Sequence, residues 1–171
     1  MKVLVYDTTE RGWPFLSTWW ALGALISGTD EKIAAPTWAD AYLQLAKIRQ
    51  PIDLLMVWGH GTAGRPLING RAVNLDKLAQ SCTTLRPESE VWFRSCEVFR
   101  GQKGKRFAED AVAALGCNVV AHTKVVSAPN PLWQRGLCAL RPGERPWWTD
   151  EGDELPGCST LAMRVPPKAY R

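Results

Sequence analysis

The chain has 171 residues, of which 46% are hydrophobic and 22% charged, a balance typical of a globular protein long enough to bury a sizeable core. Its formal net charge of +4 falls short of the strongly basic surface of a dedicated nucleic-acid-binding protein. No apolar run approaches the roughly 20 residues of a membrane-spanning helix, and the run Val3–Tyr6, ended by Asp7, is too short for a signal peptide. We therefore expect a cytoplasmic protein with no nucleic-acid or membrane partner.

Strand-like and helix-like segments alternate along the chain. Apolar, β-prone runs predict buried strands, and apolar residues three or four apart predict amphipathic helices. Thr37 and Asn74 are placed to cap two helices, and Gly116 to end a third. The predicted elements are, in chain order, a strand over 3–6, a helix over 15–27, a short strand over 33–35, a helix over 38–49, a strand over 53–58, a small hairpin over 67–70, a helix over 75–82, a strand over 90–94, a loop over 100–105, a helix over 107–115 and a strand over 118–123.

This order predicts an α/β fold with a mainly parallel sheet covered by helices on both faces. Beyond residue 126 prolines interrupt the pattern, and 132–140 and 159–165 remain as strand-like segments. We find neither an internal repeat nor a linker that would mark a second domain. The sequence therefore predicts one domain over 1–171, with a motif-bearing core over 52–126 and an irregular C-terminal part over 127–171.

Cysteine and histidine set the chemistry that the chain can perform. The five cysteines are odd in number and form no CxxC pair, which argues against a disulfide framework and a zinc ribbon. We expect reduced thiols and neither a metal nor a cofactor. The chain has two histidines, His60 and His122. Because His122 lies inside a predicted strand, we expect it to play a packed, structural role.

His60 and Cys96 each follow a predicted buried strand. His60 comes after 53–58, and Cys96 comes after 90–94. Since ligands of open parallel sheets bind beyond the carboxyl ends of the strands, the two side chains are placed to reach one substrate bond. A thiolate attacks a carbonyl carbon while an imidazole transfers the proton. The backbone N–H groups of Gly61 and Cys96 are candidates for an oxyanion hole.

The residues around this pair resemble a known family. Trp58-Gly59-His60-Gly61, at the end of an apolar strand, looks like the histidine motif of clan CD cysteine peptidases, which include caspases, gingipains, legumain, separase and CHAT proteases. Ser95-Cys96-Glu97 is similar to the nucleophile motif Ser-Ala-Cys-Glu-Thr-Gly of CHAT domains. The resemblance covers about residues 52–126. It implies a caspase-like fold, a Cys96–His60 dyad and a protein or peptide substrate.

The same resemblance implies a function for acidic residues. Family members that cleave after Arg or Lys hold that side chain with an acid at the base of the primary pocket. The resemblance therefore implies a substrate-binding role for Glu97, Asp150 or Asp153. The alternative is that 150–154 is a solvated surface loop.

Two other functions remain open on the sequence alone. The family usually has Gly soon after the Cys, whereas Val98-Phe99-Arg100 intervenes here. This departure, together with nine Trp residues, is also consistent with a catalytically inactive module that binds protein partners. Arg100–Arg106 superficially resembles a phosphate-binding loop but lacks the full Gly-x-x-x-x-Gly-Lys-Ser/Thr pattern. A flavodoxin-like phosphate binder is thus the third interpretation.

Overall fold

The computed structural model describes residues 1–9, 28–126 and 136–150. These residues form a mixed α/β structure. Its elements are β1 (Lys2–Asp7), β2 (Glu31–Ala35), α2 (Trp38–Leu45), β3 (Ile52–Trp58), β4 (His60–Thr62), β5 (Arg65–Ile68), β6 (Arg71–Ala72), α3 (Leu75–Ser81), β7 (Leu85–Arg94), α4 (Gly101–Leu115), β8 (Asn118–His122) and β9 (Leu137–Leu140).

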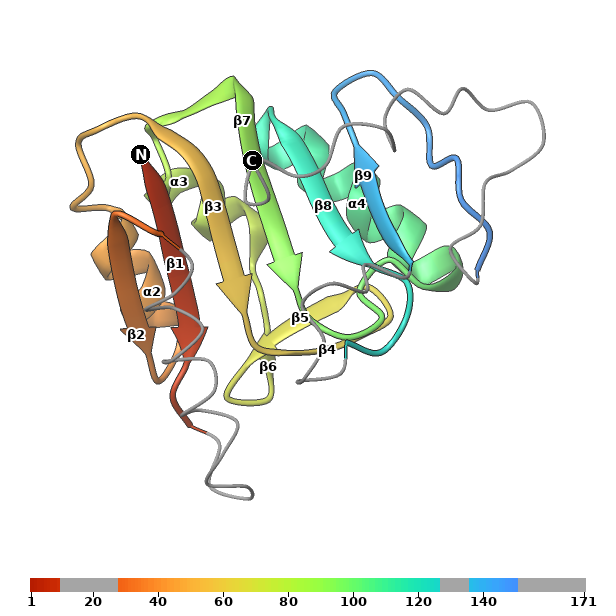
Figure 1. The fold of residues 1–171 in the computed structure, drawn as a ribbon, viewed down its shortest axis with the longest axis horizontal. Helices are drawn as coiled ribbons and strands as arrows, with labels where there is room; N and C mark the ends of the chain where they lie inside the picture. The colour runs from red at the N-terminus through yellow and green to blue at the C-terminus, as the bar shows by residue number, and fades with distance from the viewer. Residues whose placement is uncertain (10–27, 127–135, 151–171) are drawn as a thin grey trace.

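A six-stranded sheet in the order β2-β1-β3-β7-β8-β9 forms the centre of the molecule (Figure 1). Every neighbouring pair is parallel except β8 and β9, which are antiparallel. The prediction of a mainly parallel α/β sheet is therefore confirmed. The central strands β3 and β7 run side by side, with Trp58 in register with Arg94. This register brings the residues that follow each strand to the same edge of the sheet.

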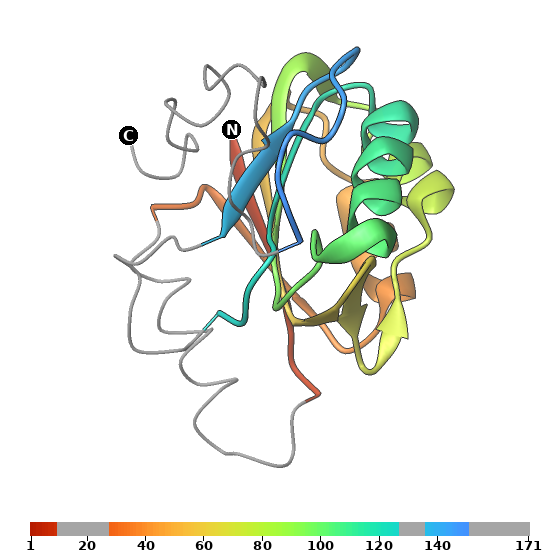
Figure 2. The same cartoon turned by 90° about the vertical axis from the view of Figure 1, so that its right-hand side faces the viewer.

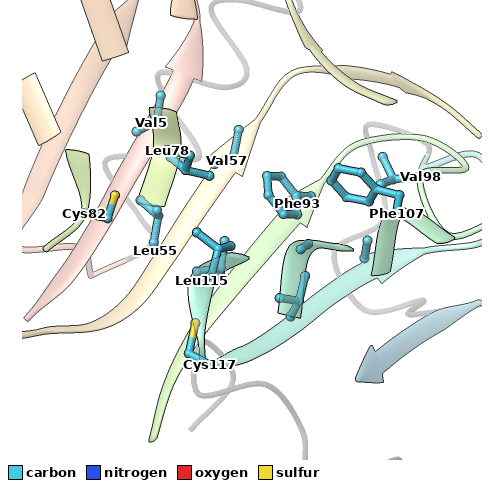
Figure 3. Packing of buried hydrophobic residues seen from close by; sticks show 14 of the residues in the cluster. Val5, Leu55, Val57, Leu78, Cys82, Phe93, Val98, Phe107, Leu115 and Cys117 are labelled. Atoms are coloured by element: carbon cyan, nitrogen blue, oxygen red, sulfur yellow. The ribbon is translucent and has the colours of Figure 1, made fainter. Parts of the chain in front are cut away.

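The three described helices, α2, α3 and α4, lie on one face of the sheet (Figure 2). Their apolar sides pack on the strands to form the main core, in which Val57 and Phe93 of the two central strands lie near Leu78 and Phe107 of the helices (Figure 3). The opposite face carries a second, smaller cluster: Leu4, Leu54, Met56, Trp58, Trp92 and Val120. The helix predicted over 15–27 lies outside the described residues.

A small antiparallel sheet, β4-β5-β6, extends beyond the carboxyl end of β3 (Figure 1). Asn69 and Gly70 form the β5–β6 turn, with φ angles of 52° and 68°. Asn-Gly is the pair that tolerates two left-handed residues in a tight hairpin turn, so the predicted hairpin is confirmed. His60 belongs to this small sheet, as the first residue of β4.

Local signals for helix ends are confirmed. The side chain of Thr37 accepts the N–H of Asp40, and that of Asn74 accepts the N–H of Lys77. Gly116 ends α4 at a φ of 65°, where its N–H donates to the carbonyl oxygen of Val112. None of the helices in the described ranges is both long and apolar enough to cross a bilayer.

Several boundaries differ from the prediction. The loop predicted over 100–105 is wrong, because α4 begins at Gly101. β7 starts at Leu85, five residues before the predicted strand, because a polar segment continues the pairing with β3 through a register shift. The segment 132–140 contributes β9 over its last four residues. The strand predicted over 159–165 lies outside the described residues.

Candidate active site

His60 leaves the main sheet immediately after β3. Gly59 makes this bend possible, because a Cβ atom there would collide with the carbonyl oxygen of Leu67 on β5. His60 then pairs with Leu67 in the β4–β5 ladder, and its side chain is exposed to solvent. The backbone geometry therefore presents the imidazole at the carboxyl edge of the sheet.

Gly61 packs directly on the residues that follow β7. A Cβ atom built on Gly61 would lie 2.5 Å from the carbonyl oxygen of Cys96 and 2.8 Å from the Cβ of Ser95. It would also lie 2.9 Å from Cγ2 of Val98. Real Cβ atoms do not approach so closely, so this contact requires glycine. The structure thus brings the His60-Gly61 and Ser95-Cys96 segments into contact, although 33 residues lie between them in sequence.

The loop after Cys96 is fixed on two sides by backbone hydrogen bonds. On the β8 side, Glu97 N–H donates to Lys124 O at 3.1 Å and Phe99 N–H donates to His122 O at 3.0 Å. On the hairpin side, the N–H of Gly64, at the β4–β5 turn, donates to the carbonyl oxygen of Val98 at 2.8 Å. These hydrogen bonds fix the position of the β4–β5 hairpin, which carries His60, relative to the segment that carries Cys96.

Trp148 packs against the loop that follows Cys96. Its ring stacks on Phe99 with centroids 5.1 Å apart and planes inclined by 7°, and its Nε1–H donates to the carbonyl oxygen of Phe99 at 3.0 Å. Gly104 of α4 approaches the same peptide so closely that a Cβ there would overlap the backbone of Phe99. The backbone beyond Cys96 is thus packed from both the helix and the C-terminal part.

Cys96 differs from the other cysteines in the described part of the chain. It is half-buried, whereas Cys82, Cys117 and Cys138 are buried. Burial raises the pKa of Cys82 and of Cys117 from 9.0 to about 12, which keeps both as neutral thiols. The sulfur of Cys96 lies 3.4 Å from the backbone nitrogen of Val126, within hydrogen-bond distance for sulfur. A cysteine outside the apolar core is the one suited to react.

The acidic residues expected at a substrate pocket are paired with nearby cations. Glu97 forms an ion pair with Arg100. Asp150 lies 3.3 Å from the ammonium group of Lys105 on α4, and Asp153 lies outside the described residues. Arg100 and Lys105 belong to the segment that resembles a phosphate loop, which is instead the N-cap and first turns of α4.

Arg94 and Asp7 were not among the site residues predicted from the sequence. The guanidinium of Arg94 lies 4.7 Å from the ring centroid of Trp58 and 5.5 Å from that of Trp92, on the face opposite the helices. Asp7, at the end of β1, is buried and reaches the hairpin that carries His60. The one signal for Asp7 in the sequence was its position at the carboxyl end of a predicted buried strand.

Tryptophan contributes to the cores rather than to an exposed surface in the ranges that the structure describes. The Trp residues there are all buried: Trp38, Trp58, Trp92, Trp147 and Trp148. His122 is also buried, on β8, as expected for a structural histidine.

In comparisons with protein-family models, curated proteins and solved structures, nothing matches this chain.

Proposed function

We propose that this protein is a cysteine hydrolase of the caspase-like, clan CD type, which cleaves peptide bonds through Cys96 and His60. The observation that carries the proposal is the contact of Gly61 with the carbonyl group of Cys96. This contact places an exposed histidine and a half-buried cysteine on touching segments at the carboxyl edge of a parallel sheet, where such sheets bind ligands.

The proposed reaction begins when His60 accepts the proton of the Cys96 thiol, which leaves a thiolate. The sulfur attacks the carbonyl carbon of the scissile amide and forms a tetrahedral intermediate. His60 donates a proton to the leaving amine, the C–N bond breaks, and a thioester remains on Cys96. Water then gives a proton to the same imidazole and adds to the thioester carbonyl, which forms a second tetrahedral intermediate. Its C–S bond breaks, the carboxylic acid leaves, and the imidazolium returns the proton to the sulfur.

Gly61 is suited to stabilise the oxyanion of this reaction. The β4–β5 turn closes on the pair Thr62–Arg65, so the next pair, Gly61–Pro66, is of the non-hydrogen-bonded type. The N–H of Gly61 therefore points away from β5 and is not part of the hairpin's own ladder. A donor of this kind is worth about 3–4 kcal/mol in transition-state stabilisation when it is aimed at the oxyanion.

An active-site-directed probe tests the proposal. Wild-type protein is incubated with a set of peptidyl acyloxymethyl ketones that differ in the residue next to the reactive carbon, and the labelled residue is located by peptide mass spectrometry. We expect label on Cys96, loss of label in Cys96→Ala and strongly reduced label in His60→Gln. Cys138→Ala, which removes a buried thiol, is the matched control and should label like the wild type.

Two outcomes would contradict the assignment. The first is equal labelling of the wild type and Cys96→Ala. The second is a wild type that no peptidyl probe labels although iodoacetamide alkylates Cys96, which would indicate an accessible thiol without a peptidase site and favour the non-catalytic binding module.

A further inference from the structure

Asp7 is a buried carboxylate that lies beside Gly59, the residue before His60, and is not part of the candidate dyad. It is 1% exposed, and burial of a carboxylate is costly unless hydrogen bonds replace its hydration. Its Oδ1 accepts the backbone N–H of Thr9 at 2.8 Å and the hydroxyl of Thr9 at 2.7 Å. Its Oδ2 accepts the backbone N–H of Asn69 at 2.9 Å. Thus one oxygen bonds locally, and the other bonds to a distant part of the chain.

The bond to Asn69 joins the main sheet to the small sheet. The two residues are 62 positions apart in sequence, and Asn69 lies in the β5–β6 turn with a φ of 52°. The three strands of the small sheet have three, four and two residues. Strands of this length are only marginally stable by themselves, so their position depends on contacts with the rest of the protein.

The small sheet is held to the rest of the protein near both of its turns. At the β4–β5 turn, Gly64 donates to Val98. At the β5–β6 turn, Asn69 donates to Asp7, and the carbonyl oxygen of Arg71 on β6 accepts Nε1–H of Trp38 at 2.8 Å. His60 lies between these anchors, paired with Leu67. Without the bond to Asp7, β5 would be held at its other end, by its own core contacts and, through β6, by the bond between Trp38 and Arg71, but the turn residue Asn69 would lose its hydrogen bond to the main sheet.

We propose that Asp7 is a positioning residue for His60: its carboxylate fixes the β5–β6 turn and, through β5, the orientation of the strand that carries the imidazole. The effect on catalysis rests on the proposed function, whereas the effect on the hairpin does not. Misplacement of a catalytic group by about 1 Å costs up to roughly 10²-fold in rate, so a lost anchor has a measurable consequence.

Two variants of the same hydrogen-bond cluster separate the roles of the two oxygens. Asp7→Asn keeps the shape but has one acceptor oxygen instead of two, so it cannot serve both the Thr9 and the Asn69 donors. Thr9→Val removes a donor to Oδ1 and leaves the bond to Asn69 in place. The chain has two histidines, so the aromatic ¹H–¹³C NMR spectrum reports on His60 and, as an internal control on β8, on His122.

We expect the His60 signal to shift or broaden in Asp7→Asn and to stay unchanged in Thr9→Val, while the His122 signal stays unchanged in both. With the best peptide substrate, Asp7→Asn should lower kcat by roughly 10- to 100-fold and leave KM within about twofold. Identical His60 signals in Asp7→Asn and wild type, or an unchanged kcat, would overturn the proposal.

A measurement on the wild type covers the case in which Asp7→Asn does not fold. The Asn69 amide should exchange with solvent at least about tenfold more slowly than the amide of Gly70 in the same exposed turn, because an amide that donates a hydrogen bond exchanges only when the bond opens. Equal exchange rates would refute the anchor. If the wild type lacks peptidase activity, the proposed function fails, and the NMR comparison still decides whether Asp7 orients His60.

Discussion

The backbone of Gly61 rests on the carbonyl group of Cys96, so closely that a methyl group on Gly61 would lie 2.5 Å from that oxygen. This contact links a hairpin that leaves β3 with a loop that leaves β7. Any side chain at position 61 must push the two segments apart, and with them the imidazole and the thiol that we assign to catalysis.

Replacement of this glycine should therefore damage the site more than the fold. Gly61→Ala is expected to lower the free energy of unfolding by about 1–3 kcal/mol through overpacking and to reduce probe labelling of Cys96 at least tenfold. Gly116→Ala is the control, because its cost is backbone strain at φ 65° with no atom within 4 Å of the new methyl group. Both quantities can be measured by urea denaturation and timed labelling; equal labelling of the two variants would contradict the expectation.

Gly104→Ala should destabilise the protein although alanine is the better helix former. Within a solvent-exposed helix this exchange gains about 1 kcal/mol. Here the new Cβ would overlap the backbone of Phe99, which cannot rotate away as a side chain can. We expect a net loss of stability in urea denaturation, accompanied by a change in Trp148 fluorescence. A stabilised Gly104→Ala variant would show that α4 does not press on the loop after Cys96.

Alkylation of the native protein should distinguish the thiols. Iodoacetamide at neutral pH is expected to modify Cys96 and to spare Cys82, Cys117 and Cys138, which are buried. A pKa of about 12 leaves only about 1% of a thiol ionised even at pH 10. Peptide mass spectrometry after timed quenching gives the rate at each site, and the same reaction in 6 M guanidinium provides the reference in which all sites react.

Alkaline pH should weaken the fold through the two buried thiols. Burial raises the pKa of Cys82 and Cys117 from 9.0 to about 12, so the native state retains protons that the unfolded chain releases. The stability that this contributes is complete below pH 9 and is lost as the pH rises toward 12. Urea denaturation at pH 7.5 and pH 10 should show a smaller drop for Cys117→Ala than for the wild type. An equal drop would indicate that Cys117 ionises as easily in the native state as in the unfolded one.

Arg94 and Trp58 should be energetically coupled. The guanidinium lies 4.7 Å from the centroid of the Trp58 ring, a distance at which cation–π attraction is worth about 0.5–1 kcal/mol at sites in contact with water. A double-mutant cycle of Arg94→Gln and Trp58→Leu, measured by urea denaturation, is expected to give a coupling energy in this range. A coupling energy near zero would show that the contact between Arg94 and Trp58 does not stabilise the fold.

The buried strands and the convergence of two motifs were predictable from sequence. Continuous apolar runs predict β3 and the end of β7, because both faces of a buried parallel strand are apolar. Such a run can be recognised from consecutive residues alone. The edge at which these strands end follows from the parallel arrangement, so the proximity of the His60 and Cys96 segments could be anticipated. The hairpin turn at Asn69-Gly70 was predictable for a similar reason, since the preference of Asn-Gly for this turn depends on those two residues alone.

The rest depends on contacts between distant residues. The first turns of α4 contain Gly101, Gly104 and several cations, a composition typical of a loop. They are helical in the structure, and Gly104 packs there on the backbone of Phe99, a contact that the composition does not reveal. Asp150 was expected to be free for a substrate, and its ion pair with Lys105 joins residues that are distant in sequence. The ion pair of Glu97 with Arg100, by contrast, is local. The role of Asp7 likewise requires a turn that lies 62 residues away.

The stacking of Trp148 on Phe99 has a consequence for the order in which the protein is made. Translation delivers Phe99 and its neighbour Cys96 first, and Trp148 emerges 49 residues after Phe99. At 5–20 residues per second this interval lasts roughly 2–10 s. A nascent chain therefore displays its cysteine before the ring that supports the adjacent peptide has left the ribosome, and the mature geometry becomes available only once synthesis has passed that tryptophan.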